Sequence, residues 1–502
     1  MLNLSGSKYA RPIAAALTSL LAACGGGSTV AGPVTPPPVT TDTAAPLIQR
    51  EMRGMWIATV ANIDWPSRTG LTADQQKAEL VDIFDRAAAA GLNAVMFHVR
   101  PAGDAVYASN LEPWASMLSG TQGVDPGYDP LAYAVTEAHR RGLELHAWIN
   151  PFRAGNSRDT AKLAPTHQFT VRRDLLRVYG TQLWFDPGEP AVHDHAMRVV
   201  TDIASRYDVD GIHADDYFYP YQENNAAGKL IDFPDSASYA RSGTALSKPD
   251  WRRDNVDRFV ERMYREVHAL RPMMKVGLSP FGIWRPGNPA GVTGLDAFAT
   301  IYADSRKWLQ RGWVDYLSPQ LYWAITGPQS YPALLDWWLA QNTMNRFVWP
   351  GLATYRVNDG TTSAFSSAEI PNQIEMTRTR AAGNGHVLYN TTTTLKKSSG
   401  AVAASLAPLY AKRALVPAYT WLDATPPPAP TLVVQGRTVT IAPGAGESAR
   451  WWVVRYRAGT TWTTRVLFGD ARSVALDVDP ERVLLNAVDQ AGNTSSAASW
   501  AK

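Results

Sequence analysis

Two hydrophobic patterns alternate along the chain between residues 47 and 422. Short apolar runs rich in β-branched and aromatic residues predict strands, and the stretches between them carry apolar residues at helical spacing. The predicted strands are "RGMWIATV" from residue 53, "NAVMFHVRP" from 93, "ELHAWINP" from 144, "GIHADDYFYP" from 211, "KVGLSPFGIW" from 275, "YLSPQLYW" from 316, "FVWPGLATY" from 347 and "HVLYNTT" from 386. Eight successive strand and helix units predict an α/β fold, a (β/α)8 TIM barrel with long loops.

The predicted helices carry end signals that support this assignment. One opens at Thr72, with Gln75 in the matching capping-box position, and stops at Gly91. The next opens with Asp129 and Pro130. A doubly wound open sheet is the structural alternative, but the glycine-rich phosphate loop that would support it does not follow the first predicted strand.

The N-terminus has the pattern of an export signal. Lys8 and Arg11 precede a short apolar run that ends in "LAAC" at Cys24, which predicts a signal peptide over residues 1–23. "LAAC" resembles the lipobox of bacterial lipoproteins, so we expect Cys24 to be lipidated. The alternative, a chance cysteine in an ordinary signal peptide, leaves the only thiol of the chain without a purpose. By resemblance to sorted lipoproteins, Gly25 favours a lipid-anchored envelope protein at the outer membrane.

Two further composition changes divide the chain. Residues 24–46 are rich in Gly, Pro and Thr and predict a tether, because they contain too little apolar surface to pack. The segment "DATPPPAP" at 423–430 ends the predicted barrel, assigned to 47–422. Beyond it, short alternating runs between turn signals predict a small all-β immunoglobulin-like sandwich over residues 427–502, which resembles a fibronectin type III module.

Composition supports a folded protein and argues against a nucleic-acid partner. The chain is 45% hydrophobic and 10% aromatic, enough to fill a sizeable core. Its formal charge of +3 includes Lys8 and Arg11, so removal of the signal peptide leaves it nearly neutral. Binding to nucleic acid needs a basic surface that such a balance does not supply.

The stretch "GIHADDYFYP" places two adjacent aspartates at the end of the fourth predicted strand. Neighbouring carboxylates raise each other's proton affinity, which is costly unless a metal, a cation or a reaction uses them. With Ile212 and Ala214 facing the helices, alternation turns His213 and Asp215 toward the barrel interior. Asp216 then lies at the rim, where it can orient Asp215 or a substrate.

The same alternation points further polar side chains inward, at the barrel mouth where strands end. They are His98 and Arg100 on the second strand, and His146, Trp148 and Asn150 on the third. We expect Arg100 to lie near enough to keep Asp215 ionised. On that basis Asp215 is the nucleophile or base, and Asp216 is the acid or a close orienting partner.

Three functions use such a ring of residues. In glycoside hydrolysis one carboxyl protonates the leaving oxygen, and another either attacks the anomeric carbon or activates water. Aromatic rings stack on the sugar faces, and the chain has 18 tryptophans that could serve in this way. A metal hydrolase would use His98, His146 and His213 with the aspartates, but neither His-x-His on the first strand nor His-Glu-x-x-His occurs. A non-catalytic glycan-binding barrel is the third. We expect no metal and no cofactor.

Longer motifs carry a family resemblance over residues 47 to 420. They are "REMRGMWIATVANIDWPS", "VMFHVRPAGDAVYASNLEPWASMLSG", "WINPFR", "DGIHADDYFYP" and "YADSRKWLQRGWVDYLSPQLYW". These motifs resemble the glycosyl-hydrolase-like ten family of bacterial envelope proteins. The resemblance implies a (β/α)8 glycosidase, and members of that family are associated with cleaving peptidoglycan glycan strands, notably strands stripped of their stem peptides.

Carried over by position, the resemblance implies a set of site residues. The implied catalytic residues are Asp215, Asp216 and Asp104, with the general acid open among Asp104, Glu112, Asp304 and Asp216. Asp304 has the alternative role of pairing with Arg306 or a helix end. The expected substrate-binding residues are His98, Arg100, Trp148, Asn150, Arg153, His213, Tyr217, Tyr219, Gln320, Tyr322 and Trp323.

Overall fold

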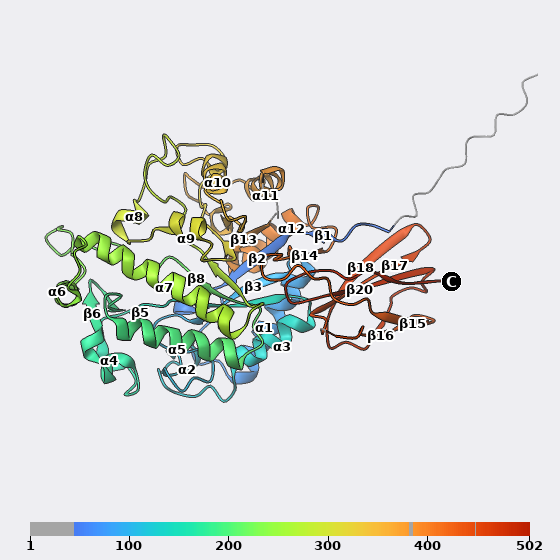
Figure 1. Cartoon of the computed structure of the whole chain (residues 1–502), viewed down its shortest axis with the longest axis horizontal. Coiled ribbons are helices and arrows are strands. Elements are labelled where there is room, and N and C mark those ends of the chain that lie inside the picture. The colour runs from blue at the N-terminus through green and yellow to red at the C-terminus, as the bar shows by residue number, and fades with distance from the viewer. Residues whose placement is uncertain (1–44, 381–384, 447) are drawn as a thin grey trace, which may run out of the picture. The chain divides into compact units, whose positions relative to one another are not determined.

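The computed structural model describes residues 45–380, 385–446 and 448–502 (Figure 1). The predicted signal peptide, Cys24 and nearly all of the predicted tether lie outside the described residues. Among the helices of the described ranges, none combines the length and the apolar character needed to cross a membrane.

A curled parallel sheet occupies the centre of the fold. In chain order its strands are β2 (Met52–Ile57), β3 (Ala94–Arg100), β4 (Glu144–Ile149), β8 (Gly211–Ala214), β9 (Lys275–Leu278), β10 (Tyr316–Leu317), β11 (Phe347–Val348), β12 (Gly351–Ala353) and β13 (Gly385–Tyr389). The order within the sheet runs β11-β10-β9-β8-β4-β3-β2-β13-β12. All eight predicted runs thus contain a strand of this sheet.

The two ends of this sheet are consecutive along the chain. Only Trp349 and Pro350 separate β11 from β12. The Trp349 amide donates to the carbonyl of Leu317 in β10 at 2.9 Å. The Pro350 carbonyl accepts from the amide of Val387 in β13 at 3.0 Å. The sheet therefore curls round until its ends meet, as in TIM-barrel-like α/β proteins.

Helices follow the strands and cover the outside of the sheet (Figure 1). Thr72 caps the first of them with the predicted capping box, and the Asp129 side chain accepts from the Ala132 amide at 3.0 Å at the start of the third. The described helices are α1 (Ala73–Ala89), α2 (Ser116–Ser119), α3 (Pro130–Arg140), α4 (Gln168–Val171), α5 (Pro190–Arg206), α6 (Ser236–Ser242), α7 (Lys248–Leu270), α8 (Ala297–Thr300), α9 (Ser305–Arg311), α10 (Tyr331–Ala340), α11 (Glu369–Arg380) and α12 (Ala401–Leu406).

Two hydrophobic clusters confirm the predicted alternation of side chains along the strands. Val95 and Phe97 of β3 belong to the large cluster that includes residues of the surrounding helices. Ala94 and Met96 of the same strand belong to a second cluster, which also holds Trp148 of β4. Because residues of one strand alternate between these clusters, one face of the sheet packs on the helices and the other lines the interior.

A small antiparallel sheet, which the sequence patterns did not predict, follows β4. It consists of β5 (Arg153–Gly155), β7 (Gln182–Phe185) and β6 (Leu176–Tyr179), in that spatial order. The β5 strand begins at Arg153, four residues after the end of β4. This sheet therefore fixes the backbone of a predicted site residue at the carboxyl end of the barrel-like sheet.

The C-terminal region contains two antiparallel sheets. One is β15 (Thr431–Gln435), β16 (Thr438–Ala442) and β19 (Ser473–Ala475), and the other is β18 (Thr461–Phe468), β17 (Trp451–Ala458), β20 (Arg482–Val488) and β21 (Ala498–Ala501). Val439 and Ile441 of the first sheet share one hydrophobic cluster with Trp452 and Val454 of the second. The two sheets therefore pack face to face, in line with the predicted all-β region.

Arg450, just before β17, forms a buried ion pair with the start of β8. Its Nε and Nη2 lie 2.9 and 2.6 Å from Asp210 Oδ1, and its Nη1 lies 2.6 Å from Asp208 Oδ2. Asp210 is fully buried and also accepts from the Leu145 amide at 2.8 Å. The Arg450 guanidinium holds the pKa of Asp210 well below its usual range, against the opposing effect of burial.

Candidate active site

Asp215 and Asp216 follow β8 directly, at the carboxyl end of the parallel sheet. Both side chains are almost fully buried, with 4% and 2% of their surface exposed. Asp215 Oδ2 accepts a hydrogen bond from Trp148 Nε1 at 3.1 Å, and its Oδ1 accepts from the Tyr217 amide at 3.2 Å. The predicted inward position of Asp215 thus brings it against Trp148 of β4.

Asp216 has a different set of donors. The Tyr221 hydroxyl donates to Asp216 Oδ2, and the Gln320 side chain, whose Nε2 donates to the Ser279 carbonyl at 2.9 Å, lowers the pKa of this carboxyl. Gln320 was predicted at the site, whereas Tyr221 was not, although it stands only one residue beyond "GIHADDYFYP". Hydrogen bonds donated to a carboxyl favour its ionised form.

Burial and mutual repulsion raise the proton affinity of this pair. Burial raises the pKa of both carboxyls, and the negative charge of Asp216 helps raise the pKa of Asp215 to about 7. Opposing this, the Arg153 guanidinium lowers the pKa of each. The pair as a whole therefore has a raised proton affinity near neutral pH.

Arg153, not Arg100, is the cation beside the pair. Its guanidinium carbon lies 3.8 Å from the centroid of the Tyr217 ring. Arg100, which was expected to keep Asp215 ionised, instead binds Glu112, with its Nε 2.8 Å from Oε2. The reason is that the loop after β3 carries a buried carboxylate within reach of Arg100, and a buried cation pairs with the nearest acid.

The other three candidates for the general acid, Glu112, Asp304 and Asp104, each have different hydrogen-bond partners. Arg100 and His195 hold the pKa of Glu112 below its usual range despite burial, so this carboxyl stays ionised. Asp304 caps α9 by accepting from the Lys307 amide at 3.4 Å, which matches its alternative structural role. Asp104 accepts from Gln122 Nε2 at 3.1 Å, and burial raises its pKa to about 6.

The inward histidines form the layer beneath the carboxyl pair. His98 is fully buried and stacks on Trp148, with ring centroids 3.9 Å apart, and neither of its nitrogens has a hydrogen-bond partner within the described ranges. His213 and His146 both hydrogen-bond to the Tyr316 hydroxyl, at 3.0 and 2.8 Å. Stacking of His98 fixes the plane of the indole whose nitrogen holds Asp215.

The predicted aromatic residues divide into two groups. Tyr322 stacks on Tyr389 with centroids 5.9 Å apart, and both remain partly accessible. Tyr389 was not predicted as a site residue, although it lies in the eighth predicted strand, just before Asn390. Burial is the main cause that raises the pKa of Tyr389, and the charge of Asp215 adds to it. Tyr219, in contrast, is buried and packs edge-on against Phe233.

The remaining predicted residues lie around the same edge of the sheet. Asn150 is buried and donates from Nδ2 to the Pro101 carbonyl at 3.1 Å, which ties the ends of β3 and β4 together. Trp323 packs edge-on against Phe281, with centroids 5.7 Å apart. Tyr217 also packs edge-on against Tyr221. Aromatic and amide side chains thus gather at the carboxyl end of the sheet, where the pair lies.

The residues of the metal alternative do not come together as ligands. Within the ranges the structure describes, no group of three or more His, Cys, Asp or Glu side chains is arranged to hold a metal ion. His146 also lies 3.2 Å from Glu144, and His213 Nε2 lies 3.0 Å from Ser279 Oγ, so both are engaged in the interior network.

We expect glycan hydrolysis to survive prolonged chelation, because the carboxyl pair can act on the leaving oxygen and on water without a Lewis acid. The measurement is turnover before and after dialysis against EDTA, with a mock-dialysed sample as control. Activity that is abolished by EDTA and restored by zinc or manganese would contradict the expectation.

Comparisons with known proteins identify the family of this chain. Residues 51–366 match the family model described as glycosyl hydrolase-like 10. The chain is 40% identical over 395 residues to "Glycosyl hydrolase YngK" of Bacillus subtilis, covering 76% of each protein. It is 35% identical over 332 residues to "Glycosyl hydrolase DigH" of Escherichia coli K12, covering 61% of this chain and 74% of the relative.

Among solved structures, the glycoside hydrolase domain of PgaB (BpsB) from Bordetella bronchiseptica aligns with a TM-score of 0.47 and 13% identity, over 71% of this chain and 98% of that one. The catalytic domain of a Paenibacillus polymyxa β-amylase aligns with a TM-score of 0.46 and 12% identity, over 72% and 98%. On the strength of the family match and the sequence relatives, this chain belongs to the glycosyl hydrolase-like 10 family and is a glycoside hydrolase.

Proposed function

We propose that this enzyme cleaves glycosidic bonds in the glycan strands of peptidoglycan, including strands that lack stem peptides. The observation that carries the catalytic part is the pair of buried carboxyls after β8, one of which has its pKa raised to about 7. The family resemblance and the export signal of the sequence support the choice of a cell-envelope glycan. Polar and aromatic side chains around the pair suit a polysaccharide substrate.

In the proposed mechanism Asp215 is the general acid and Asp216 is the ionised partner. Asp215 protonates the glycosidic oxygen as its bond to the anomeric carbon breaks. Asp216 either attacks the anomeric carbon itself or takes a proton from the water that attacks it. This division exchanges the roles expected from the sequence. It rests on the Tyr221 hydrogen bond and the neighbouring Gln320 side chain, which favour the ionised form of Asp216, and on the charge of Asp216, which helps raise the pKa of Asp215.

Digestion of purified glycan strands tests the proposed substrate. Peptidoglycan is treated with an amidase to remove stem peptides, incubated with the enzyme, and the products are identified by mass spectrometry, alongside strands that keep their peptides. Release of shorter glycan fragments from the peptide-free strands is the expected result. Intact strands after incubation, with hydrolysis of another envelope polysaccharide instead, would contradict the proposed substrate.

Finer features of the architecture belong to the same proposal. We assign β11 and β12 to one interrupted strand that completes an eight-stranded (β/α)8 barrel, on the basis of the hydrogen bonds on either side of Trp349 and Pro350. We assign the C-terminal sheets of three and four strands to a fibronectin type III-like sandwich. The number of strands and their shared core support that assignment.

The proposed location is the cell envelope, with Cys24 as the lipid-anchored first residue of the mature protein at the outer membrane. Cys24→Ser removes the lipidated thiol, so we expect the variant to move from the membrane fraction to the soluble envelope fraction. Fractionation and labelling with palmitate measure this shift, with the wild-type chain as control. The lipid anchor would be refuted if the variant sediments with membranes as wild type does and the wild-type protein incorporates no palmitate.

A further inference from the structure

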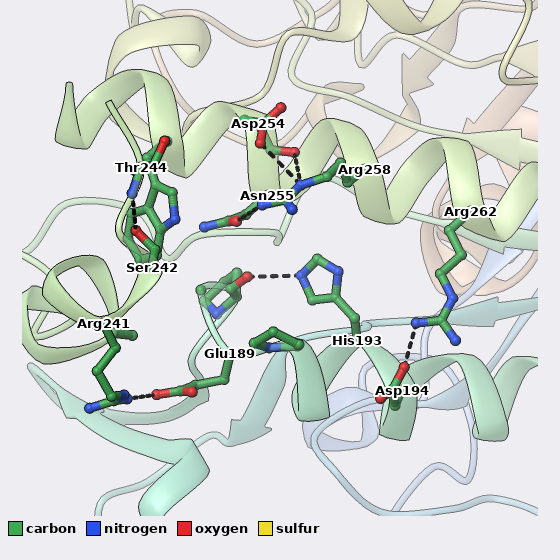
Figure 2. A pocket seen from close by; sticks show the side chains of 15 residues that line it. Glu189, His193, Asp194, Arg241, Ser242, Thr244, Asp254, Asn255, Arg258 and Arg262 are labelled. Carbon is green, nitrogen blue, oxygen red and sulfur yellow. Dashed lines mark hydrogen bonds and ion pairs between the residues drawn. The ribbon is translucent and has the colours of Figure 1, made fainter. Parts of the chain in front are cut away.

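A cavity of about 790 Å³ lies between α5, α6 and α7, and none of its lining residues belongs to the carboxyl site (Figure 2). Its walls come from residues 187–194 at the start of α5, residues 238–244 around α6, and residues 251–262 in α7. A volume of this size accommodates a ligand of several rings. Neither the sequence patterns nor the family motifs singled out these side chains.

Two walls of the cavity belong to connections that leave the carboxyl end of the parallel sheet, where the carboxyl pair lies. In TIM-barrel-like folds the N-terminal ends of the helices lie beside the carboxyl ends of the strands that precede them. The wall at α5 is built from the start of that helix and the residues just before it, whereas the wall at α7 runs from Trp251 to Arg262, past the middle of the helix. In addition, the loop that leaves Asp216 continues through α6 into α7, so one connection joins the catalytic pair to the cavity wall.

Three arginines line the cavity, and each forms an ion pair with an acidic residue (Figure 2). One pair lies within α7, and the other two join different walls of the cavity. Arg241 binds Glu189, Arg258 Nε lies 3.0 Å from Asp254 Oδ2, and Arg262 Nη1 lies 2.6 Å from Asp194 Oδ1. The charges of these pairs cancel, so the lining does not select an ion. Paired guanidinium and carboxylate groups still present free N–H donors and oxygen acceptors side by side, as neighbouring sugar hydroxyls require.

A glycine allows the loop before α5 to pack closely against Trp251 in the cavity wall. A Cβ on Gly188 would lie 2.3 Å from the Trp251 ring, so the loop can approach this ring only without a side chain. The Ser242 and Thr244 hydroxyls line the far wall (Figure 2). His193, which also lines the cavity, has its pKa lowered to about 4 by burial and is neutral. The lining therefore combines apolar surface, which is its larger part, with hydroxyls and balanced charges.

We propose that this cavity is a distal subsite that binds uncharged sugar units, such as N-acetylhexosamines, of the glycan strand whose cleavage takes place at Asp215 and Asp216. The inference rests on the proposed function. It adds that the enzyme holds long strands at a second point on its catalytic side, which short oligosaccharides are unable to reach. A lining of balanced donors and acceptors, joined to the catalytic pair by the connection that runs from Asp216 through α6 to α7, carries the proposal.

The test compares KM for long peptide-free glycan strands with KM for short oligosaccharides cut from the same strands. Arg258→Gln removes one lining cation, and Arg86→Gln is its matched control. Both arginines form i,i+4 helical pairs, with 60% and 53% of their side chains exposed. We expect Arg258→Gln to raise KM for long strands about 3- to 10-fold relative to Arg86→Gln, as the loss of one or two hydrogen bonds predicts.

Ser242→Trp fills the cavity and gives a second measurement, the affinity for long strands by titration calorimetry, with thermal unfolding as the folding control. Weaker binding of long strands alone supports the distal subsite. Equal KM and equal affinity in Arg258→Gln, Ser242→Trp and the control overturn it, as does an identical change for long and short substrates. A wild-type protein that binds long strands in a Ser242-dependent way but hydrolyses none would refute the proposed function and leave the subsite supported.

Discussion

Asp215→Asn and Asp216→Asn each reduce turnover of glycan strands by about 100-fold or more, the usual effect of losing a general acid or base. Asparagine keeps the shape of the side chain and the hydrogen bonds from Trp148 and Tyr221 in reach. It cannot supply the proton to the leaving oxygen or attack the anomeric carbon. Because each substitution also removes one of two repelling carboxyls, we expect the thermal unfolding temperature to stay unchanged or rise slightly.

Asp104→Asn is the comparison that makes this result specific. Asp104 is also buried with a raised pKa, but its oxygens accept from Gln122 and the Ala102 amide. We expect a smaller loss of turnover for this variant than for either member of the pair. Turnover near wild type in Asp215→Asn or Asp216→Asn would remove that residue from the mechanism, and a large loss in Asp104→Asn alone would move the acid to the loop after β3.

Arg450→Met lowers the free energy of unfolding by about 3–5 kcal/mol, the usual cost of leaving a buried charge without its partner. Asp210 is fully buried at the start of β8, and Arg450 supplies two close contacts to its Oδ1. After the substitution, His139 and the Leu145 amide are the hydrogen-bond partners left to this carboxyl within the described part of the chain. Urea unfolding of the full chain measures the loss.

Arg457→Met is the matched control for this prediction. Arg457 lies in β17 and pairs with Glu481 at 3.3 Å, but half of the Glu481 side chain is exposed. Exposed pairs contribute about 0–1 kcal/mol, so the control should unfold nearly as wild type does. Equal losses in the two arginine variants would show that Arg450 does not act through the buried Asp210. Adding Asp210→Asn to Arg450→Met should restore part of the stability, because it removes the unpaired charge.

The parts of the fold that follow from local pattern were predicted from the sequence. Alternation along β3 and β8 depends only on neighbouring residues, and it correctly turned His98, His213 and Asp215 away from the helices. The capping box at Thr72 is likewise local. The β5-β7-β6 sheet was missed because its strands are three or four residues long and too short to show a period.

The electrostatics of the site needed the structure, because the decisive pairs join distant segments. Arg100 ends β3 and Arg153 lies four residues beyond β4, so both are at the carboxyl end of the sheet. Nothing in the neighbouring sequence tells which of the two will lie beside Asp215. Glu112 captures Arg100 together with His195, a residue 83 positions further along the chain. Only the folded arrangement leaves Arg153 as the cation beside the pair. The proposed exchange of roles between Asp215 and Asp216 rests in part on a contact within one loop, the hydrogen bond from Tyr221 to Asp216.

The pH dependence of kcat/KM on peptide-free glycan strands tests the central claim most directly, because this quantity reports the ionisation of groups in the free enzyme. Burial and the charge of Asp216 raise the pKa of Asp215 to about 7, so the acid is present below that pH and is lost as the pH rises through it. We predict a descending alkaline limb with its midpoint near pH 7. A rate that continues undiminished well above this pH would contradict the assignment of Asp215 as the proton donor.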